Sequence, residues 1–268
     1  MQQEILAWSF LGIVVCSPVA WMIAIYRRQH FSIAQFGLWT MAHIVVRILW
    51  RTKMPSFPDA AKESVVIICN HRSSVDPFFL QVCFSRPMHW MVAREYCEHP
   101  SFRWFLKQAE VIPVNRGGID TASTKSAIRL AAAGGVVGLF PEGRINQTDD
   151  FMLPVRPGAL LVALKARVPI VPCYIEGAPF DGTPWSPFFR TAQTRVTFGE
   201  PVDLSPYFEQ EQDKAWSGEK MLEIVSRIAE LADQPGDQIR LAGRNWKPSV
   251  REVRAQAEAR RNGASRKQ

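Results

Sequence analysis

Six short apolar segments alternate with helical segments along the chain, and this alternation restricts the fold more than any other feature of the sequence. The strand candidates are Val65–Cys69, Met88–Ala93, Val111–Val114, Val136–Phe140, Ile170–Ile175 and Thr194–Phe198. The helix candidates are Pro77–Phe84, Arg103–Gln108, Thr121–Ala133, Pro157–Lys165 and Lys220–Ala232. Such alternation is typical of α/β domains. The sequence therefore predicts a single α/β domain whose mixed, mostly parallel sheet is flanked by helices.

A long segment without charge precedes this domain. Ile5–Tyr26 holds 22 uncharged residues, and a helix of that length, at about 1.5 Å per residue, spans the roughly 30 Å hydrocarbon core of a bilayer. The basic pair Arg27-Arg28 follows it and marks the carboxyl side as cytoplasmic. We expect a transmembrane helix here. A buried helix or a hairpin helix that enters one leaflet is the alternative.

The segment Phe31–Arg51 is also apolar, but its polar residues fall on one side of a helix. They are Ser32, Gln35, Thr40, His43, Arg47 and Arg51. One polar side indicates an amphipathic helix, not a second membrane span. Its apolar side is expected either to lie at the headgroup boundary of a bilayer or to dock on the α/β domain, and the sequence leaves both open. His43 belongs to the polar side and is predicted to be structural.

Basic residues are concentrated at the carboxyl terminus. Residues 238–268 contain nine Lys/Arg and two acidic residues, so this tail carries the whole net charge of +7. The tail is expected either to be a solvated, partly disordered end or to be attracted to anionic lipid headgroups. Nucleic acid is not an expected partner, because Trp246 is the one aromatic residue of the tail and no nucleic-acid-binding module precedes it.

These features divide the chain into four parts: a membrane anchor helix (1–30), an amphipathic helix (31–53), the α/β domain (54–235) and the basic tail (236–268). The five cysteines are odd in number and show no CxxC spacing. They argue against a disulfide framework or a zinc site, and for a reducing compartment.

The first predicted strand is followed by Asn70-His71-Arg72-Ser73-Ser74-Val75-Asp76. Open α/β sheets usually carry their sites at strand ends. A histidine at such a place can take a proton from a hydroxyl group while an aspartate orients its ring. His71 and Asp76 can meet only if the chain turns between them, and Ser73 or Ser74 as a helix N-cap would supply that turn. The alternative is that His71 and Asp76 merely cap a helix.

Three further predicted strands are of interest, two of them because they lead into charged residues that could bind a ligand. Val111–Val114 leads to Asn115-Arg116-Gly117-Gly118, and an arginine with exposed backbone amides can hold a phosphate. Val136–Phe140 leads to Pro141-Glu142-Gly143-Arg144, a turn with a charged pair. The segment Val168–Ile175 contains two prolines, and by itself predicts an edge or rim strand.

Together and in this order, the four clusters resemble the glycerophospholipid acyltransferase family, whose members resemble bacterial 1-acylglycerol-3-phosphate acyltransferases. The first family motif, NHxxxxD, matches Asn70, His71 and Asp76. The second matches the strand that ends in Arg116, the third matches Phe140-Pro141-Glu142-Gly143, and the fourth matches the strand Val168–Pro172. The resemblance covers roughly residues 64–201, and a hydrophobic helical element before the first motif is also similar to family members.

The resemblance implies a membrane enzyme of phospholipid synthesis, with its catalytic domain on the cytoplasmic face. It would move a fatty acyl group from acyl-CoA or acyl carrier protein to the hydroxyl of a lysophospholipid, above all 1-acylglycerol 3-phosphate. His71 would be the general base and Asp76 its orienting partner. Arg116 would hold the acceptor phosphate, and Glu142 with Gly143 would shape the same pocket. Motif support would come from Asn70, Ser73, Pro141 and Pro172. No bound cofactor and no metal are implied.

The third motif departs from the form EGTR that is common in lysophosphatidate acyltransferases. Here Arg144 follows Gly143 directly, which is similar to lysophospholipid-remodelling relatives. The acceptor headgroup therefore stays open, and a lysophospholipid-remodelling or lyso-aminolipid enzyme is an alternative. Arg144 is either a second phosphate ligand or an ion-pair partner of Glu142, and Arg72 either reaches a phosphate or faces water. Alternatives of other classes are a membrane-anchored hydrolase and a lipid-binding protein without catalysis.

Overall fold

A computed structural model describes residues 20–54, 57–58, 63–115, 120–180, 182–210 and 213–243, together with residues 1, 4, 8, 14, 16 and 17. Half of the predicted membrane helix Ile5–Tyr26, most of the basic tail and Arg116 lie outside these residues. Within the described residues, no helix is long and apolar enough to cross a membrane.

Six strands form one sheet in the order β3-β2-β4-β1-β5-β6. The strands are β1 (Val65–Cys69), β2 (Met88–Ala93), β3 (Ile112–Val114), β4 (Val136–Leu139), β5 (Ile170–Glu176) and β6 (Arg195–Phe198). All neighbours pair in parallel except β5 and β6, which are antiparallel. The prediction of a mixed, mostly parallel sheet is confirmed.

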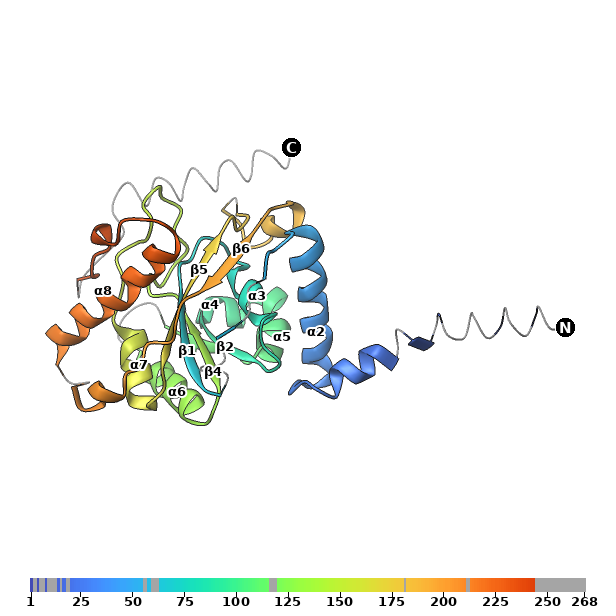
Figure 1. Ribbon diagram of the computed structural model, residues 1–268, viewed down its shortest axis with the longest axis horizontal. Coiled ribbons are helices and arrows are strands. Elements are labelled where there is room, and N and C mark those ends of the chain that lie inside the picture. The colour runs from blue at the N-terminus through green and yellow to red at the C-terminus, as the bar shows by residue number, and fades with distance from the viewer. Residues whose placement is uncertain are drawn as a thin grey trace.

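Helices cover both faces of the sheet (Figure 1). They are α2 (Ile33–Ile44), α3 (Asp76–Gln81), α4 (Arg94–Glu98), α5 (Pro100–Gln108), α6 (Thr121–Ala132), α7 (Gly158–Ala166) and α8 (Lys214–Leu231). Val66 and Ile68 of β1 pack in a core with α6, α7 and α8. Val65 and Ile67 point the other way, into a core with α2 and α3. Because successive side chains of a strand point to opposite faces, one fully buried strand supports both layers.

Several element ends differ from their predicted positions. The helix predicted over Pro77–Phe84 spans Asp76–Gln81, and α4 was not predicted. Helix α8 begins six residues before the predicted Lys220, because Asp213 caps it by accepting the N–H groups of Ala215 and Trp216. Gly218 lies inside this helix, where an added Cβ would come within 2.7 Å of the Leu241 side chain. The close approach of Leu241 thus explains why a residue without a side chain stands inside this helix, where glycine is otherwise unfavourable.

The strand β5 lies in the interior of the sheet, between β1 and β6, so of the two predicted positions, edge or rim, the edge is wrong. Its Pro172 is tolerated because the ladder with β6 starts one residue later, at Cys173. The Pro172 carbonyl still accepts the N–H of Gly199, at 2.8 Å, beyond the end of β6. A proline can therefore stand in an interior strand at the point where pairing with one neighbour ends.

The amphipathic segment is a helix that docks on the domain. Ser32 and Gln35 form a capping box at the start of α2, and a short π-helix, Val45–Leu49, continues it. Trp39 Nε1 donates to the Phe84 carbonyl, and Trp50 Nε1 donates to the Pro187 carbonyl, each at 3.0 Å. On the other side of the segment, Ile33, Met41, Ile44 and Ile48 are exposed. The segment therefore docks on the α/β domain, and the side that faces away from the domain is apolar as well.

Candidate active site

The predicted meeting of His71 and Asp76 is confirmed. His71 lies just beyond the carboxyl end of β1, and Asp76 is the first residue of α3. Nδ1 of His71 lies 2.9 Å from Oδ2 of Asp76. The same oxygen accepts the backbone N–H groups of Arg72 and Ser73, each at 2.8 Å. With Nδ1–H directed at a buried carboxylate, Nε2 is the ring nitrogen left to accept a proton.

The chain turns between these residues in a way that the sequence did not predict. The N-cap of α3 is Val75, without a side-chain cap, so the prediction of Ser73 or Ser74 in that role is wrong. Both serines donate instead to carbonyls of the segment after β5: Ser73 to Pro179 at 2.6 Å and Ser74 to Pro184 at 3.0 Å. The Asp76 carboxylate holds the turn, because it binds two backbone N–H groups of the preceding residues.

Asn70 attaches this turn to the sheet. Its Nδ2 donates to the Ile175 carbonyl at 2.9 Å, and its Oδ1 accepts the Ile175 N–H at 2.8 Å. Because the side-chain amide of Asn70 makes both bonds, it acts like a backbone peptide group. It thereby extends the pairing of β1 and β5 by one residue beyond the end of β1. The side chain of Asn70 therefore fixes where the backbone leaves the sheet, directly before His71.

Glu142 lies beneath His71 and is buried, with 2% exposure. Its Oε1 accepts the backbone N–H of His71, and its Oε2 accepts that of Leu153, each at 2.8 Å. Both carboxylate oxygens are thus used inside the protein, where they bind the backbone on either side of the site. Burial, against the opposing effect of these two hydrogen bonds, raises the pKa of Glu142 to about 8.

The destabilisation caused by Glu142→Gln is expected to shrink as the pH rises from about 5 to about 8. The raised pKa of Glu142 means that the folded protein holds the proton more tightly than the unfolded chain does. Its contribution to folding is therefore largest below the ordinary pKa of 4.5 and is lost as the pH approaches about 8. The glutamine side chain does not titrate. At every pH it offers one hydrogen-bond acceptor oxygen where the glutamate has two oxygens. Thermal unfolding of both proteins at the two pH values measures the difference, and a gap in Tm that widens with pH would contradict the expectation.

Arg72 holds the loop that follows the third motif. Its Nη1 donates to the Thr148 carbonyl and its Nη2 to the Asp150 carbonyl, each at 2.6 Å. The Asn146 N–H donates to the His71 carbonyl at 2.7 Å. Arg72 therefore neither faces water nor presents a free guanidinium to a phosphate, the two roles that the sequence left open. It joins the His71 turn to residues 146–151.

The remaining predicted residues are placed as follows. Pro141 and Pro172 are buried, and the Pro141 carbonyl accepts the Arg156 N–H at 3.0 Å. Gly143 has a φ of 69°, which favours glycine, and its N–H donates to the Phe140 carbonyl. Arg144 is half-buried in the same turn. Arg116 lies outside the described residues, and β3, which precedes it, ends at the same edge of the sheet as β1.

Sequence reasoning missed one neighbour of the histidine. The ring of Phe140 stacks on the imidazole of His71, with 3.8 Å between ring centroids. The sequence signal was the position of Phe140 at the end of a predicted strand, next to the third motif. No group of three or more His, Cys, Asp or Glu side chains that could hold a metal ion occurs within the described ranges.

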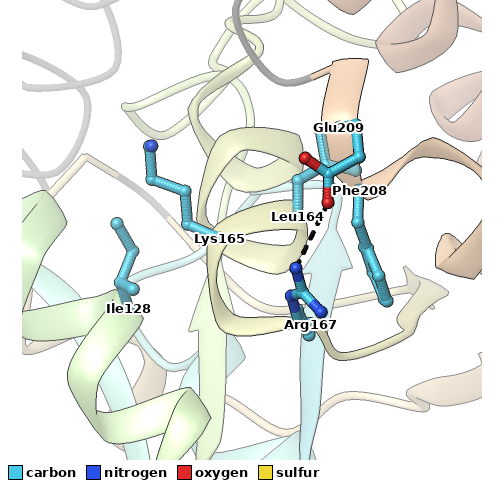
Figure 2. A pocket seen from close by; sticks show the side chains of 6 residues that line it. All are labelled: Ile128, Leu164, Lys165, Arg167, Phe208 and Glu209. Carbon is cyan, nitrogen blue, oxygen red and sulfur yellow. Dashed lines mark hydrogen bonds and ion pairs between the residues drawn. The ribbon is translucent and has the colours of Figure 1, made fainter.

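The structure also has a surface hollow of about 370 Å³, and Figure 2 shows the residues that line it. Its lining residues are Ile128, Leu164, Lys165, Arg167, Phe208 and Glu209. Arg167 and Glu209 form an ion pair of 3.3 Å across it. The hollow adjoins the carboxyl end of α7, which leads into the start of β5, so it lies near the edge of the sheet opposite to His71. None of its lining residues belongs to the histidine site.

Comparison with known proteins gives three findings. A family described as Acyltransferase matches residues 50–176. The chain is 30% identical over 148 residues to 1-acyl-sn-glycerol-3-phosphate acyltransferase of Bacillus subtilis, which is 55% of this chain and 71% of the relative. It is 25% identical over 215 residues to the enzyme of the same name from Cocos nucifera, covering 76% of this chain and 68% of the relative.

Among solved structures, the fold is similar to the crystal structure of the 1-acyl-sn-glycerophosphate acyltransferase PlsC from Thermotoga maritima. The TM-score is 0.56 and the sequence identity 16%, with 87% of this chain and 98% of the other covered. At this identity the likeness concerns the fold. The matched region, residues 50–176, contains His71, Asp76 and Glu142.

Proposed function

The chain belongs to the glycerophospholipid acyltransferase family and is an acyltransferase, and from that premise we propose that it acylates a lysophospholipid, with 1-acylglycerol 3-phosphate as the foremost acceptor. The donor is acyl-CoA or acyl carrier protein, both thioesters. The observation that carries the proposal is the hydrogen bond of His71 to Asp76 at the carboxyl edge of the sheet. It leaves Nε2 as a base for the acceptor hydroxyl.

The reaction proceeds in one transfer. Nε2 of His71 takes the proton of the acceptor hydroxyl, and the oxygen attacks the thioester carbonyl carbon. The new C–O bond forms, the C–S bond breaks, and the departing thiolate receives the proton from the imidazolium. Asp76 stabilises the positive charge that the ring carries between these events. A thioester is already activated, so base catalysis, worth about 10²–10⁴-fold, and proximity suffice without an acyl-enzyme.

The acceptor phosphate is bound, in this proposal, at the carboxyl ends of β3 and β4. Arg116 supplies the bidentate contact, and Arg144 is the second cation. Gly143 shapes the turn of the third motif, which lies between the His71 site and Arg144. Glu142 contributes indirectly, because it holds the His71 backbone and the Leu153 backbone together.

Replacing Arg116 with alanine is expected to raise KM for phosphate-bearing acceptors by about tenfold or more, since a charged hydrogen bond is worth roughly 1.5–3 kcal/mol. A phosphate-free acceptor such as a lyso-aminolipid should show little change. The assay offers acyl-CoA or acyl carrier protein with lysophosphatidate, glycerol 3-phosphate, lysophosphatidylethanolamine and a lyso-aminolipid, and measures acylated product and free fatty acid. Equal loss on all acceptors would mean that Arg116 is structural, and fatty acid without acylated lipid would indicate a hydrolase.

The enzyme is further proposed to work at a membrane, with its catalytic domain on the cytoplasmic side. The uncharged segment Ile5–Tyr26 and the basic pair after it support this. The outer side of α2 and its π-helical extension exposes Ile33, Ile44 and Ile48, which suits contact with a bilayer surface. Recovery of the full chain in the soluble fraction after cell lysis, without detergent or salt, would contradict membrane attachment.

A further inference from the structure

Phe140 lies flat against the imidazole of His71. The two ring centroids are 3.8 Å apart and the planes differ by 7°. The contact follows from the sheet, because β1 and β4 are neighbouring parallel strands in which Ile68 pairs with Leu139. Phe140 directly follows Leu139, and His71 leaves the sheet at the same edge. The register of the two strands thus brings the rings together.

A third ring supports Phe140 from behind. Trp90 of β2 stacks on Phe140, with 4.7 Å between centroids and 16° between planes, and it is 4% exposed. Trp90 pairs with Gly138 of β4. An added Cβ at Gly138 would lie 2.7 Å from Cε3 of Trp90 and 2.8 Å from its Cδ2, which is closer than atoms tolerate. Glycine at this place makes room for Trp90, and Trp90 limits how far Phe140 can retreat from His71.

The hydrogen bond to Asp76 alone does not fix the imidazole. It fixes Nδ1, and the ring can still tilt about the line from Nδ1 to Oδ2, which moves Nε2 toward or away from an acceptor hydroxyl. A parallel ring in contact with one face prevents tilting toward that side. The negative face of a phenyl ring also attracts a cation, so the same contact favours the imidazolium formed when Nε2 takes a proton.

We propose that Phe140, backed by Trp90 in the space that Gly138 leaves, is a positioning residue that sets the plane of His71 and stabilises its protonated form during acyl transfer. This rests on the proposed function, since it requires His71 to be the base. Phe140 touches the base through its ring face, and its effect on the substrates is exerted through His71. It should therefore change kcat and leave the KM values of donor and acceptor unchanged.

The test compares Phe140→Leu, Phe140→Tyr and a control, Phe198→Leu. Phe198 is also partly buried and packs edge-on against Phe57, with 5.0 Å between ring centroids, away from His71. Phe140→Leu is expected to lower kcat about tenfold, which corresponds to about 1.4 kcal/mol in the barrier, with both KM values within about twofold of wild type. Phe140→Tyr keeps a ring in place and should restore most of kcat. Phe198→Leu should lose a similar amount of Tm and keep kcat.

A Phe140→Leu enzyme with wild-type kcat overturns the proposal, and so does a Phe140→Tyr enzyme as slow as Phe140→Leu. Equal losses of kcat in Phe140→Leu and Phe198→Leu would show a general packing effect and overturn it too. Should Phe140→Leu fail to fold, Gly138→Ala leaves Phe140 in place and displaces Trp90, and an unchanged kcat there overturns the proposal in the same way. If wild type transfers no acyl group, the proposed function itself has failed. If wild type is active and His71→Ala is not, only the role of Phe140 is under test.

Discussion

Replacing His71 with alanine is expected to lower kcat for acyl transfer by about 10²–10⁴-fold, the range of general base catalysis. The substitution removes Nε2, which is the proton acceptor in the proposed reaction. It leaves the fold in place, because the contacts that hold this turn use the backbone N–H and carbonyl of His71, which bind Glu142 and Asn146. The KM values should change little, since the ring does not bind the acceptor phosphate.

The measurement is initial-rate transfer from acyl-CoA or acyl carrier protein to lysophosphatidate, with Tm as the check on folding. His43→Ala is a suitable control, because His43 is another half-buried histidine that lies on α2 and contacts Trp39. It should keep kcat within about twofold, because His43 lies on α2, outside the turn that holds His71 and Asp76. Full activity in His71→Ala would remove the base from the mechanism.

Asp76→Asn is expected to lower kcat by a comparable factor, about 10²–10⁴-fold, while the protein still folds with a moderately lower Tm. Oδ2 of Asp76 accepts three N–H groups, from the His71 ring and from two backbone positions. An asparagine oxygen in that place can keep these bonds but carries no charge to stabilise the imidazolium. In the Ser-His-Asp triad the corresponding change costs about 10⁴ in kcat.

The expected Tm of Asp76→Asn depends on the second carboxylate oxygen, Oδ1. Oδ1 of Asp76 is buried and has no hydrogen-bond partner in the part of the chain that the structure describes. The asparagine amide would put two N–H donors at the position of this oxygen and would weaken the three hydrogen bonds that the carboxylate accepts, so Tm is expected to fall moderately while the protein still folds. Kinetics and thermal unfolding of Asp76→Asn therefore separate the two roles. A large fall in Tm with a kcat near that of wild type would make Asp76 a structural residue.

The pattern of apolar segments predicted the sheet well, because burial on both faces produces continuous apolar strands. Strands β1 and β2 have the predicted bounds, and Asn70, His71 and Asp76 follow β1 as predicted. The meeting of His71 and Asp76 could be predicted since both lie within one short turn. The two residues are five positions apart, so the local geometry of the turn decides whether their side chains meet.

The roles of Glu142, Arg72 and Phe140 could not be predicted in the same way. Each depends on a contact with a partner about 70 or more positions away: Glu142 and Phe140 reach His71, and Arg72 reaches Thr148. Such contacts arise from strand order and register, which a single sequence does not reveal. The interior position of β5 was missed for a related reason, because a proline forbids only those ladder bonds in which its own nitrogen would take part.

The position of β3 in the sheet has a consequence for how enzymes of this design can diverge. It is an edge strand of three residues with Pro113 in its middle, and it pairs with β2 alone. A change in the length or composition of the segment after it therefore disturbs one neighbouring strand at most. His71 follows β1, which pairs with β4 and β5, so the same kind of change there would disturb two neighbouring strands. We expect acceptor preference to evolve by remodelling at this periphery, while the proton-transfer machinery at the centre of the sheet is inherited unchanged.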